Sequence, residues 1–167
     1  MALPEIKGPR QAISFVSVDE TALPKGRLKL RRWLQEIASL HGAVVVSLSY
    51  AFGSSEWMAK LNFEHLGHEG DTDILTFDYT LPPAESKKSA KAPNLAQQPY
   101  RIHGECCICP SRVMAQSRDW GTRPEEEMQR VMVHGLLHLL GQNDQTTAQR
   151  KLMREAEDKA LAIFALL

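Results

Sequence analysis

Two histidines and an aspartate near the C-terminal end have the residue types and spacing of a metal site. They lie in the segment His134-Gly-Leu-Leu-His138-Leu-Leu-Gly141-Gln-Asn-Asp144. Histidines four residues apart share one face of a helix. Gly141 lets the chain turn sharply, so that Asp144 can return as a third ligand. Imidazole and carboxylate ligands suit Zn²⁺, and three protein ligands leave a fourth position open, which is typical of a catalytic site.

The residues around these histidines favour a metal over an ordinary pair of histidines. Apolar side chains surround them between Val131 and Leu140, which predicts a buried helix. Buried imidazoles need polar partners, and a divalent ion satisfies both nitrogens at once. Two histidines at this spacing would by themselves more often be core or surface residues. Met153 packs in the core or lies beneath the metal, and the sequence leaves both interpretations open.

One residue argues against a zinc peptidase. The spacing of the two histidines, the glycine and the third ligand matches that of metzincin proteases, in which a Glu follows the first histidine. Here that position is Gly135. The standard peptide-hydrolysis mechanism therefore lacks its general base, and we keep a peptidase only as a disfavoured alternative.

The motif and its flanking blocks resemble the YbeY family of endoribonucleases and rRNA maturation factors. The resemblance extends from Leu61 to Glu157 and depends on four blocks in the expected order. They are Leu61-Asn62, Thr72-Asp73-Ile-Leu-Thr-Phe77, Gly104-Glu105 with Ile108, and the histidine motif followed by Met153 and Glu157. Two departures stand out: Leu66 occupies the position of an Arg found in many members, and Gln142-Asn143 replaces a Tyr-Asp pair.

The resemblance implies a small α+β fold and one Zn²⁺ per chain, held by His134, His138 and Asp144. Most members have a third histidine at the last of these positions, and aspartate remains a competent ligand. It also implies single-strand-specific cleavage of RNA, maturation of the 3′ end of 16S rRNA, and a part in ribosome quality control. The implied partners are ribosomal RNA, the small ribosomal subunit and its proteins. Leu66 favours the alternative of a non-catalytic ribosome-assembly factor with a structural zinc.

The general base and the RNA contacts are less well marked in the sequence. Candidates for the base are His68, Asp73, His103 and Glu105, each of which is more often structural. His65 or His68 is a possible substitute for the arginine missing at Leu66. Candidate phosphate contacts form two basic groups, Lys25, Lys29 and Arg32 on one helix face and Lys87, Lys88 and Lys91 in a loop.

Three cysteines lie within four residues, at positions 106, 107 and 109. On a strand, Cys107 and Cys109 point one way and Cys106 the other, so one metal cannot readily collect all three. We therefore predict that they pack in the core. An odd number of cysteines at this spacing also cannot form a disulfide framework, which favours a reducing compartment.

The elements that must position these residues follow from periodicity and turn signals. Strands are expected at residues 12–16, 44–52, 73–79 and 101–109. Helices are expected at 25–40, 55–65, 111–119, 122–140 and 146–165, the fourth starting with a capping box from Thr122 to Glu125. Residues 80–99 hold four prolines and no periodicity, and are predicted to form a mobile loop. The prediction is one α+β domain over residues 1–167, with a small mixed sheet of about four strands, about five helices and the metal site at the end of a buried helix.

Composition limits the class of protein and the way it finds a partner. The chain has 167 residues, 43% of them hydrophobic, with 20 basic and 20 acidic side chains. This excludes a disordered chain and a strongly basic one. We expect a cytoplasmic protein without a membrane segment, because there is no long apolar run and no signal-like N-terminus. Any RNA contact must be local, because Lys25 to His41 is basic while the chain as a whole is neutral.

Overall fold

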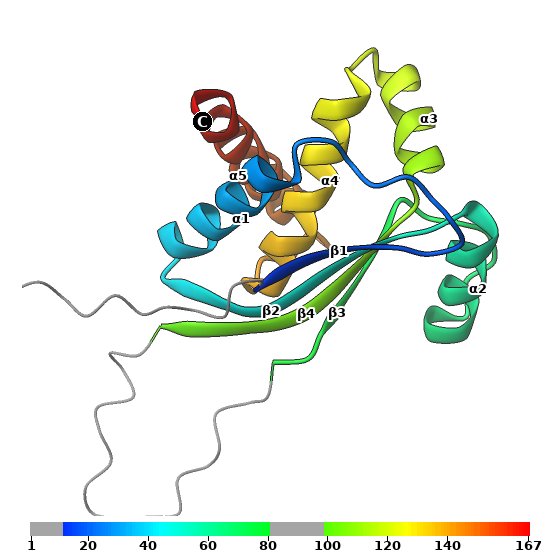
Figure 1. Ribbon diagram of the computed structural model, residues 1–167, viewed down its shortest axis with the longest axis horizontal. Helices are drawn as coiled ribbons and strands as arrows, with labels where there is room; N and C mark the ends of the chain where they lie inside the picture. The colour runs from blue at the N-terminus through cyan, green and yellow to red at the C-terminus, as the bar shows by residue number, and fades with distance from the viewer. Residues whose placement is uncertain (1–11, 81–98) are drawn as a thin grey trace, which may run out of the picture.

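The computed structural model describes residues 12–80 and 99–167 (Figure 1). Within them the chain forms strands β1 (Ile13–Ser17), β2 (Ala43–Phe52), β3 (Ile74–Asp78) and β4 (Tyr100–Ile108). The helices are α1 (Arg27–Leu40), α2 (Ser55–Leu66), α3 (Pro110–Trp120), α4 (Pro124–Leu139) and α5 (Thr147–Leu166). The predicted α+β class and the order of elements are confirmed. The predicted loop over residues 80–99, with Lys87, Lys88 and Lys91, lies outside the described residues except for its two ends.

The four strands form one mixed sheet in the order β1-β2-β4-β3. β1, β2 and β4 run parallel, and β3 pairs antiparallel with β4 at the edge. Helices α1, α4 and α5 lie on one face of the sheet, and α2 lies across one end on the other side (Figure 1). Alternate residues of β4 therefore face two separate cores. Among the described residues β3 is therefore one edge of the sheet, next to α4, and β1 is the other.

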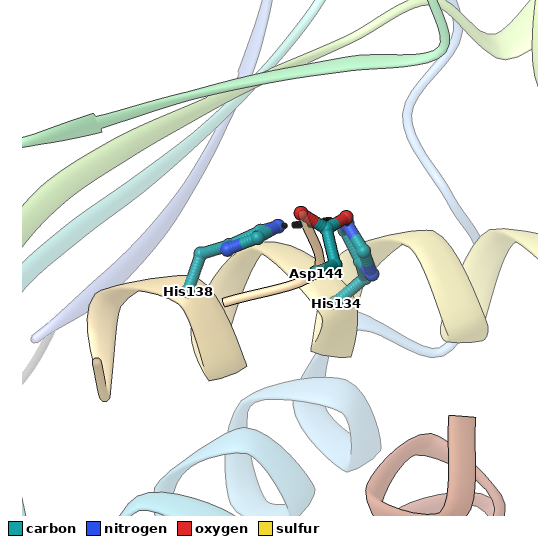
Figure 2. Close-up of side chains that lie close together, drawn as sticks. All are labelled: His134, His138 and Asp144. Atoms are coloured by element: carbon teal, nitrogen blue, oxygen red, sulfur yellow. Dashed lines mark hydrogen bonds and ion pairs between the residues drawn. The ribbon is translucent and has the colours of Figure 1, made fainter. Parts of the chain in front are cut away.

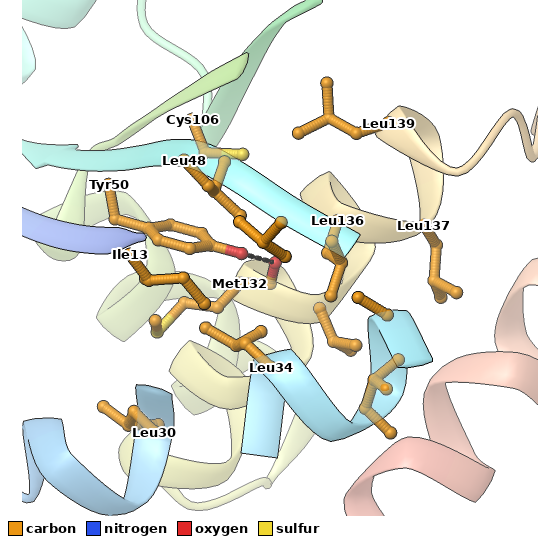
Figure 3. Close-up of a cluster of buried hydrophobic side chains, with 14 of the residues drawn as sticks. Ile13, Leu30, Leu34, Leu48, Tyr50, Cys106, Met132, Leu136, Leu137 and Leu139 are labelled. Carbon is orange, nitrogen blue, oxygen red and sulfur yellow. Dashed lines mark hydrogen bonds between the residues drawn. The ribbon is translucent and has the colours of Figure 1, made fainter. Parts of the chain in front are cut away.

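One buried hydrogen bond attaches the helical layer to the sheet, and a second joins two of its helices. The Tyr50 hydroxyl on β2 donates to the Met132 carbonyl of α4 at 2.9 Å (Figure 3). The Trp33 ring of α1 donates to the Ala160 carbonyl of α5 at 2.7 Å. Buried Tyr and Trp polar groups normally find such partners, because an unpaired one costs free energy. These bonds orient α4, which carries His134 and His138, and α5, which follows the turn that contains Asp144.

The ends of α4 and α5 show where local sequence rules succeed and fail. Thr146 caps α5, and with Gln149 it forms a capping box. The capping box predicted at the start of α4 is wrong: the N-cap residue is Arg123, which makes no side-chain cap bond. Pro124 is the first helical residue, so the third is Glu126 and not Glu125. The Thr122 hydroxyl instead donates to the Glu127 carboxylate at 3.2 Å.

Helix α4 approaches β3 and β4 at a position where a side chain would not fit. A Cβ at Gly135 would lie 2.7 Å from Cys106 Sγ and 2.8 Å from Ile74 Cδ1. On the other side of the contact, a Cβ at Gly104 would lie 2.8 Å from the side chain of Leu139 and 2.9 Å from the Phe77 carbonyl oxygen. Two glycines therefore let the helix and the sheet meet closely. The same packing closes the position at which a metzincin carries its catalytic Glu.

The cysteines pack as predicted. Cys106 belongs to the core under α4, whereas Cys107 and Cys109 belong to the smaller core beside Met58 of α2. All three are free thiols and buried. Burial raises the pKa of Cys106 to about 12, and burial with the nearby Glu105 carboxylate raises that of Cys107 to about 12.

We expect Gly135→Ala to lower the free energy of unfolding by up to about 2 kcal/mol. Alanine favours an unhindered helix over glycine by about 1 kcal/mol, but overpacking a tight core costs about 1–3 kcal/mol. Urea unfolding measures the change. Cys106→Ala removes the nearest atom, so in that background the loss from Gly135→Ala should shrink. A more stable Gly135→Ala protein would contradict the close contact.

The native thiols should react negligibly with a disulfide reagent at pH 8, because all three are buried and only the thiolate is nucleophilic, and burial raises the pKa of Cys106 and Cys107 to about 12. A colorimetric thiol assay in buffer and in denaturant checks this. Three thiols should appear on unfolding. Fast reaction of one or more thiols in buffer would show that the strand is more accessible than its packing indicates.

Candidate metal centre

His134, His138 and Asp144 converge at the C-terminal end of α4, as the sequence predicts (Figure 2). The two Nε2 atoms lie 3.0 Å apart, and Asp144 Oδ2 lies 3.6 Å from each of them. All three side chains are partly exposed, with 24%, 28% and 39% of their surface accessible. Among the described residues, these three are the group of His, Cys, Asp or Glu side chains that could hold a metal ion, with ligand atoms within 4.8 Å of one another.

Each imidazole turns its Nε2 toward the site and is held in place by a hydrogen bond from its Nδ1. His134 Nδ1 donates to Glu157 Oε1 at 2.8 Å, and His138 Nδ1 donates to the Gln142 carbonyl at 2.9 Å. In the neutral form of each ring, the proton is then on Nδ1 and the lone pair is on Nε2. Three acceptor atoms therefore face one another. Such a set is unfavourable without a cation among them, because a single proton can serve only two of the three.

The distances fit a tetrahedral metal ion. Ligands bound at about 2.0–2.1 Å in tetrahedral geometry lie about 3.3 Å apart, and the three observed separations, 3.0, 3.6 and 3.6 Å, lie on either side of that value. A metal-binding histidine usually donates a hydrogen bond from the ring nitrogen that does not bind the metal, as both of these histidines do. The donor set therefore fits a divalent ion with an open fourth position.

Glu157 of α5 is the residue that sequence reasoning from the histidine motif missed. It is 5% exposed, and its second oxygen accepts from Arg130 at 3.0 Å. Arg130 also pairs with Asp158 at 2.7 Å, and Arg154 lies 3.6 Å from Glu157. The signal was present, because Glu157 shares the buried face of α5 with Met153 and Ala160 at helical spacing. A carboxylate on such a face requires a charged or hydrogen-bonding partner.

The carboxylates around His134 raise the pKa of its imidazole. Burial lowers the pKa of His134, but the hydrogen bond and charge of Glu157, together with the charges of Asp144 and Asp73, outweigh it and raise the pKa above its ordinary value. The pocket thus stabilises positive charge at the imidazole. The same negative field favours a bound divalent cation.

Asp144 reaches the site through a short turn after α4. Gly141 has a φ of +88°, a backbone conformation that favours glycine. The Gln142 amide donates to the Leu137 carbonyl at 3.0 Å and ends the helix. Arg150 of α5 then donates to the Gln145 carbonyl at 2.7 Å and to that of Asp144 at 3.3 Å. The third ligand is therefore fixed from both sides of the turn.

A cleft of about 640 Å³ opens over the three ligands. Its other wall is formed by β3 together with the C-terminal end of α2. Asp73 is the one general-base candidate among its lining residues; the lining does not include His68, His103 or Glu105. Of the two histidines considered as substitutes for the missing arginine, His65 lines the cleft beside Leu66.

The predicted basic contacts are not part of this cleft. Lys25, Lys29 and Arg32 belong to or precede α1 and are exposed, and Lys29 Nζ lies 4.3 Å from the ring centre of Phe164. Among the described residues that line the cleft there is no Lys or Arg. RNA contact by these α1 residues stays a prediction, and it would have to occur outside the cleft.

Comparisons with known proteins point to one family. A family model described as Endoribonuclease YbeY matches residues 16–165. A protein of Porphyromonas gingivalis called Endoribonuclease YbeY is 34% identical over 144 residues, which cover 86% of this chain and 84% of that protein. One of the same name from Cytophaga hutchinsonii is 31% identical over 153 residues, covering 92% and 96%. A solution structure from Thermotoga maritima shares the fold, with a TM-score of 0.58 and 24% identity over 91% of this chain and 88% of that one.

Glu157→Gln should weaken metal binding about 10- to 100-fold, because it removes the charge that holds and polarises His134 while keeping an acceptor. Titration of the metal-free protein against a chromophoric chelator measures the affinity. Asp158→Asn is the matched control, since Asp158 contacts Arg130 but not His134. Equal affinities for the two variants would show that the Glu157 contact does not act on the metal.

Proposed function

Because the chain belongs to the YbeY family of endoribonucleases, we propose that it hydrolyses RNA in the cleft above His134, His138 and Asp144. The observation that carries this proposal is the convergence of three acceptor atoms at one wall of an open cleft. The imidazole rings are fixed from behind, so the site is organised before a substrate arrives. Open space above the ligands leaves room for a phosphodiester.

We propose zinc as the ion that these three residues hold. Two imidazoles and one carboxylate are a common zinc donor set, and fewer than four protein ligands is typical of catalytic sites. When bound, such an ion acts as a Lewis acid that activates water and stabilises charge on a phosphoryl oxygen. The chain itself provides the fixed geometry, through Glu157 behind His134 and the Gln142 carbonyl behind His138.

Asp73 is the side chain that we propose as proton acceptor. It lies in the cleft, close enough to His134 for its charge to raise the pKa of that imidazole. Its Oδ1 accepts from the Ile74 amide at 2.9 Å and from the Thr72 hydroxyl at 3.1 Å. These bonds hold the carboxylate in place, and Oδ2 has no protein donor among the described residues. Oδ2 is therefore the atom that takes a proton from an attacking water.

The substrate that we propose is single-stranded ribosomal RNA, with the 3′ end of 16S rRNA as the processing site and ribosome quality control as the context. A cleft whose described lining has no Lys or Arg cannot attract RNA strongly by charge. We therefore propose that the small ribosomal subunit and its proteins guide the enzyme to its site. None of the described helices is long and apolar enough to span a membrane, and a cytoplasmic location agrees with a ribosomal substrate.

Two alternatives make different predictions. A zinc peptidase requires a base beside the first histidine, and the packing of Gly135 against Cys106 leaves no room for one. A binding factor with a structural zinc has one specific observation in its favour, which is the exposed Leu66 at the mouth of the cleft. It would associate with ribosomes and leave RNA and protein uncut.

The zinc-loaded protein should cleave single-stranded rRNA fragments, lose this activity in a chelator, and leave casein intact. His138→Ala should lose stoichiometric zinc and reduce cleavage to background, because two ligands cannot hold the ion. His68→Ala is the control, since this exposed histidine does not line the cleft. Gel analysis of the RNA and metal content by mass spectrometry are the readouts.

The contrary outcomes separate the alternatives. Zinc retained at one per chain in both His138→Ala and Asp144→Asn would disprove the metal site. Casein cleavage would support the peptidase. Ribosome association without cleavage of either substrate would support the binding factor.

A further inference from the structure

Two stacked aromatic rings connect the metal cleft to a second cavity. Phe77 at the end of β3 lines the metal cleft, and Tyr79, two residues later, lines a separate cavity of about 280 Å³ with Thr80, Arg101 and His103. The two ring centres lie 6.5 Å apart and the rings are within 10° of parallel. His65 of α2 continues the row on the cleft side, edge-on to Phe77 at 4.9 Å. The row therefore leads from the metal ligands to Arg101.

The rings are accessible and held in place. Tyr79 is 57% exposed, and Phe77 is partly buried beside the smaller core. The Tyr79 hydroxyl donates to the Glu105 carboxylate at 3.2 Å, and its backbone amide donates to the His103 carbonyl at 2.8 Å. Exposed aromatic rings fixed by hydrogen bonds lose little conformational entropy when a flat ligand stacks on them.

Charge decides which part of a nucleic acid can lie against this row. Asp78 lies between the two aromatic residues in the sequence, but its side chain points to the opposite face of β3. The carboxylate beside the rings is Glu105, 3.2 Å from the Tyr79 hydroxyl, so a phosphate there would be repelled. Uncharged base faces would not. The two ring centres lie 6.5 Å apart and the rings are nearly parallel, so one single strand can reach both of them. Arg101 is exposed in the far cavity and forms no ion pair with other described residues.

We propose that Phe77 and Tyr79 stack the bases of single-stranded RNA next to the scissile phosphate, and that Arg101 binds a backbone phosphate in the adjoining cavity. This inference rests on the proposed function for its substrate. It assigns recognition to side chains that do not contact the metal ligands. It also gives a physical reason for preferring single strands, because a duplex hides its base faces.

Binding by fluorescence anisotropy tests the row in a His138→Ala background, where the labelled RNA is not cut. Tyr79→Ala should bind a single-stranded RNA about 5- to 100-fold more weakly, the range typical for loss of one stacked base. Tyr79→Phe keeps the ring and should bind within about twofold. Circular dichroism checks folding. Equal affinities of Tyr79→Ala and Tyr79→Phe would overturn the proposal.

Two further readouts separate stacking from a structural effect. An RNA with abasic sites should bind the parent and Tyr79→Ala equally, because the partner of the ring is gone. Arg101→Gln should make the salt dependence shallower, by about 0.7 in the slope of log K against log salt, the value for one phosphate on a single strand. An unchanged slope would remove Arg101 from the proposal, and a loss for Tyr79→Ala that persists with abasic RNA would disprove stacking.

Cleavage kinetics keep this inference distinct from the proposed function. In the zinc-loaded protein, Tyr79→Ala should raise KM for a single-stranded RNA and leave kcat within a few-fold. If the protein cleaves RNA and Tyr79→Ala changes neither KM nor affinity, the stacking proposal is wrong and the proposed function stands. If the protein cleaves no RNA but Tyr79→Ala still loses single-strand binding, the proposed function is wrong and the stacking of bases on the rings is supported.

Discussion

The close approach of α4 to β3 and β4 is the contact on which the metal centre depends. Gly135 and Gly104 provide the space for it, because a Cβ at either position would overlap atoms of the opposite element. With the helix this close, His134 and His138 emerge beside β3, and the space between this strand and the ligands becomes the cleft. A helix held farther from the sheet would carry the same histidines without a facing wall. Interiors packed at crystal-like density transmit such shifts instead of absorbing them.

A second constraint comes from α5, which supplies a buried carboxylate to the first ligand. Glu157 would be costly in this position without partners, and His134 and Arg130 supply them. The arrangement fixes one imidazole tautomer and surrounds the ion site with negative charge. It therefore favours a cation at the centre, and the raised pKa of His134 is another expression of the same field.

The neutral charge of the chain agrees with the site. The described residues lining the cleft include no Lys or Arg, so under the proposed function a nucleic acid would meet the three candidate metal ligands, the carboxylates of Asp73 and Asp78, and the ring of Phe77 there. Affinity of this kind depends on local geometry and less on ionic strength. It agrees with the proposal that the small ribosomal subunit guides the enzyme to its RNA site.

The sequence alone determined the order of elements, the shared helix face of His134 and His138, and the return of Asp144 after Gly141. All of these follow from periodicity and from turn residues within a few positions. It did not determine the partnership of Glu157 with His134, the position of Asp73 in the cleft away from the other three candidate bases, or the row from Phe77 to Tyr79. Those depend on how β3 and α5 pack against α4. Such contacts join residues far apart in the chain, and only the tertiary structure decides them, because no local pattern specifies the depth and register at which two elements meet.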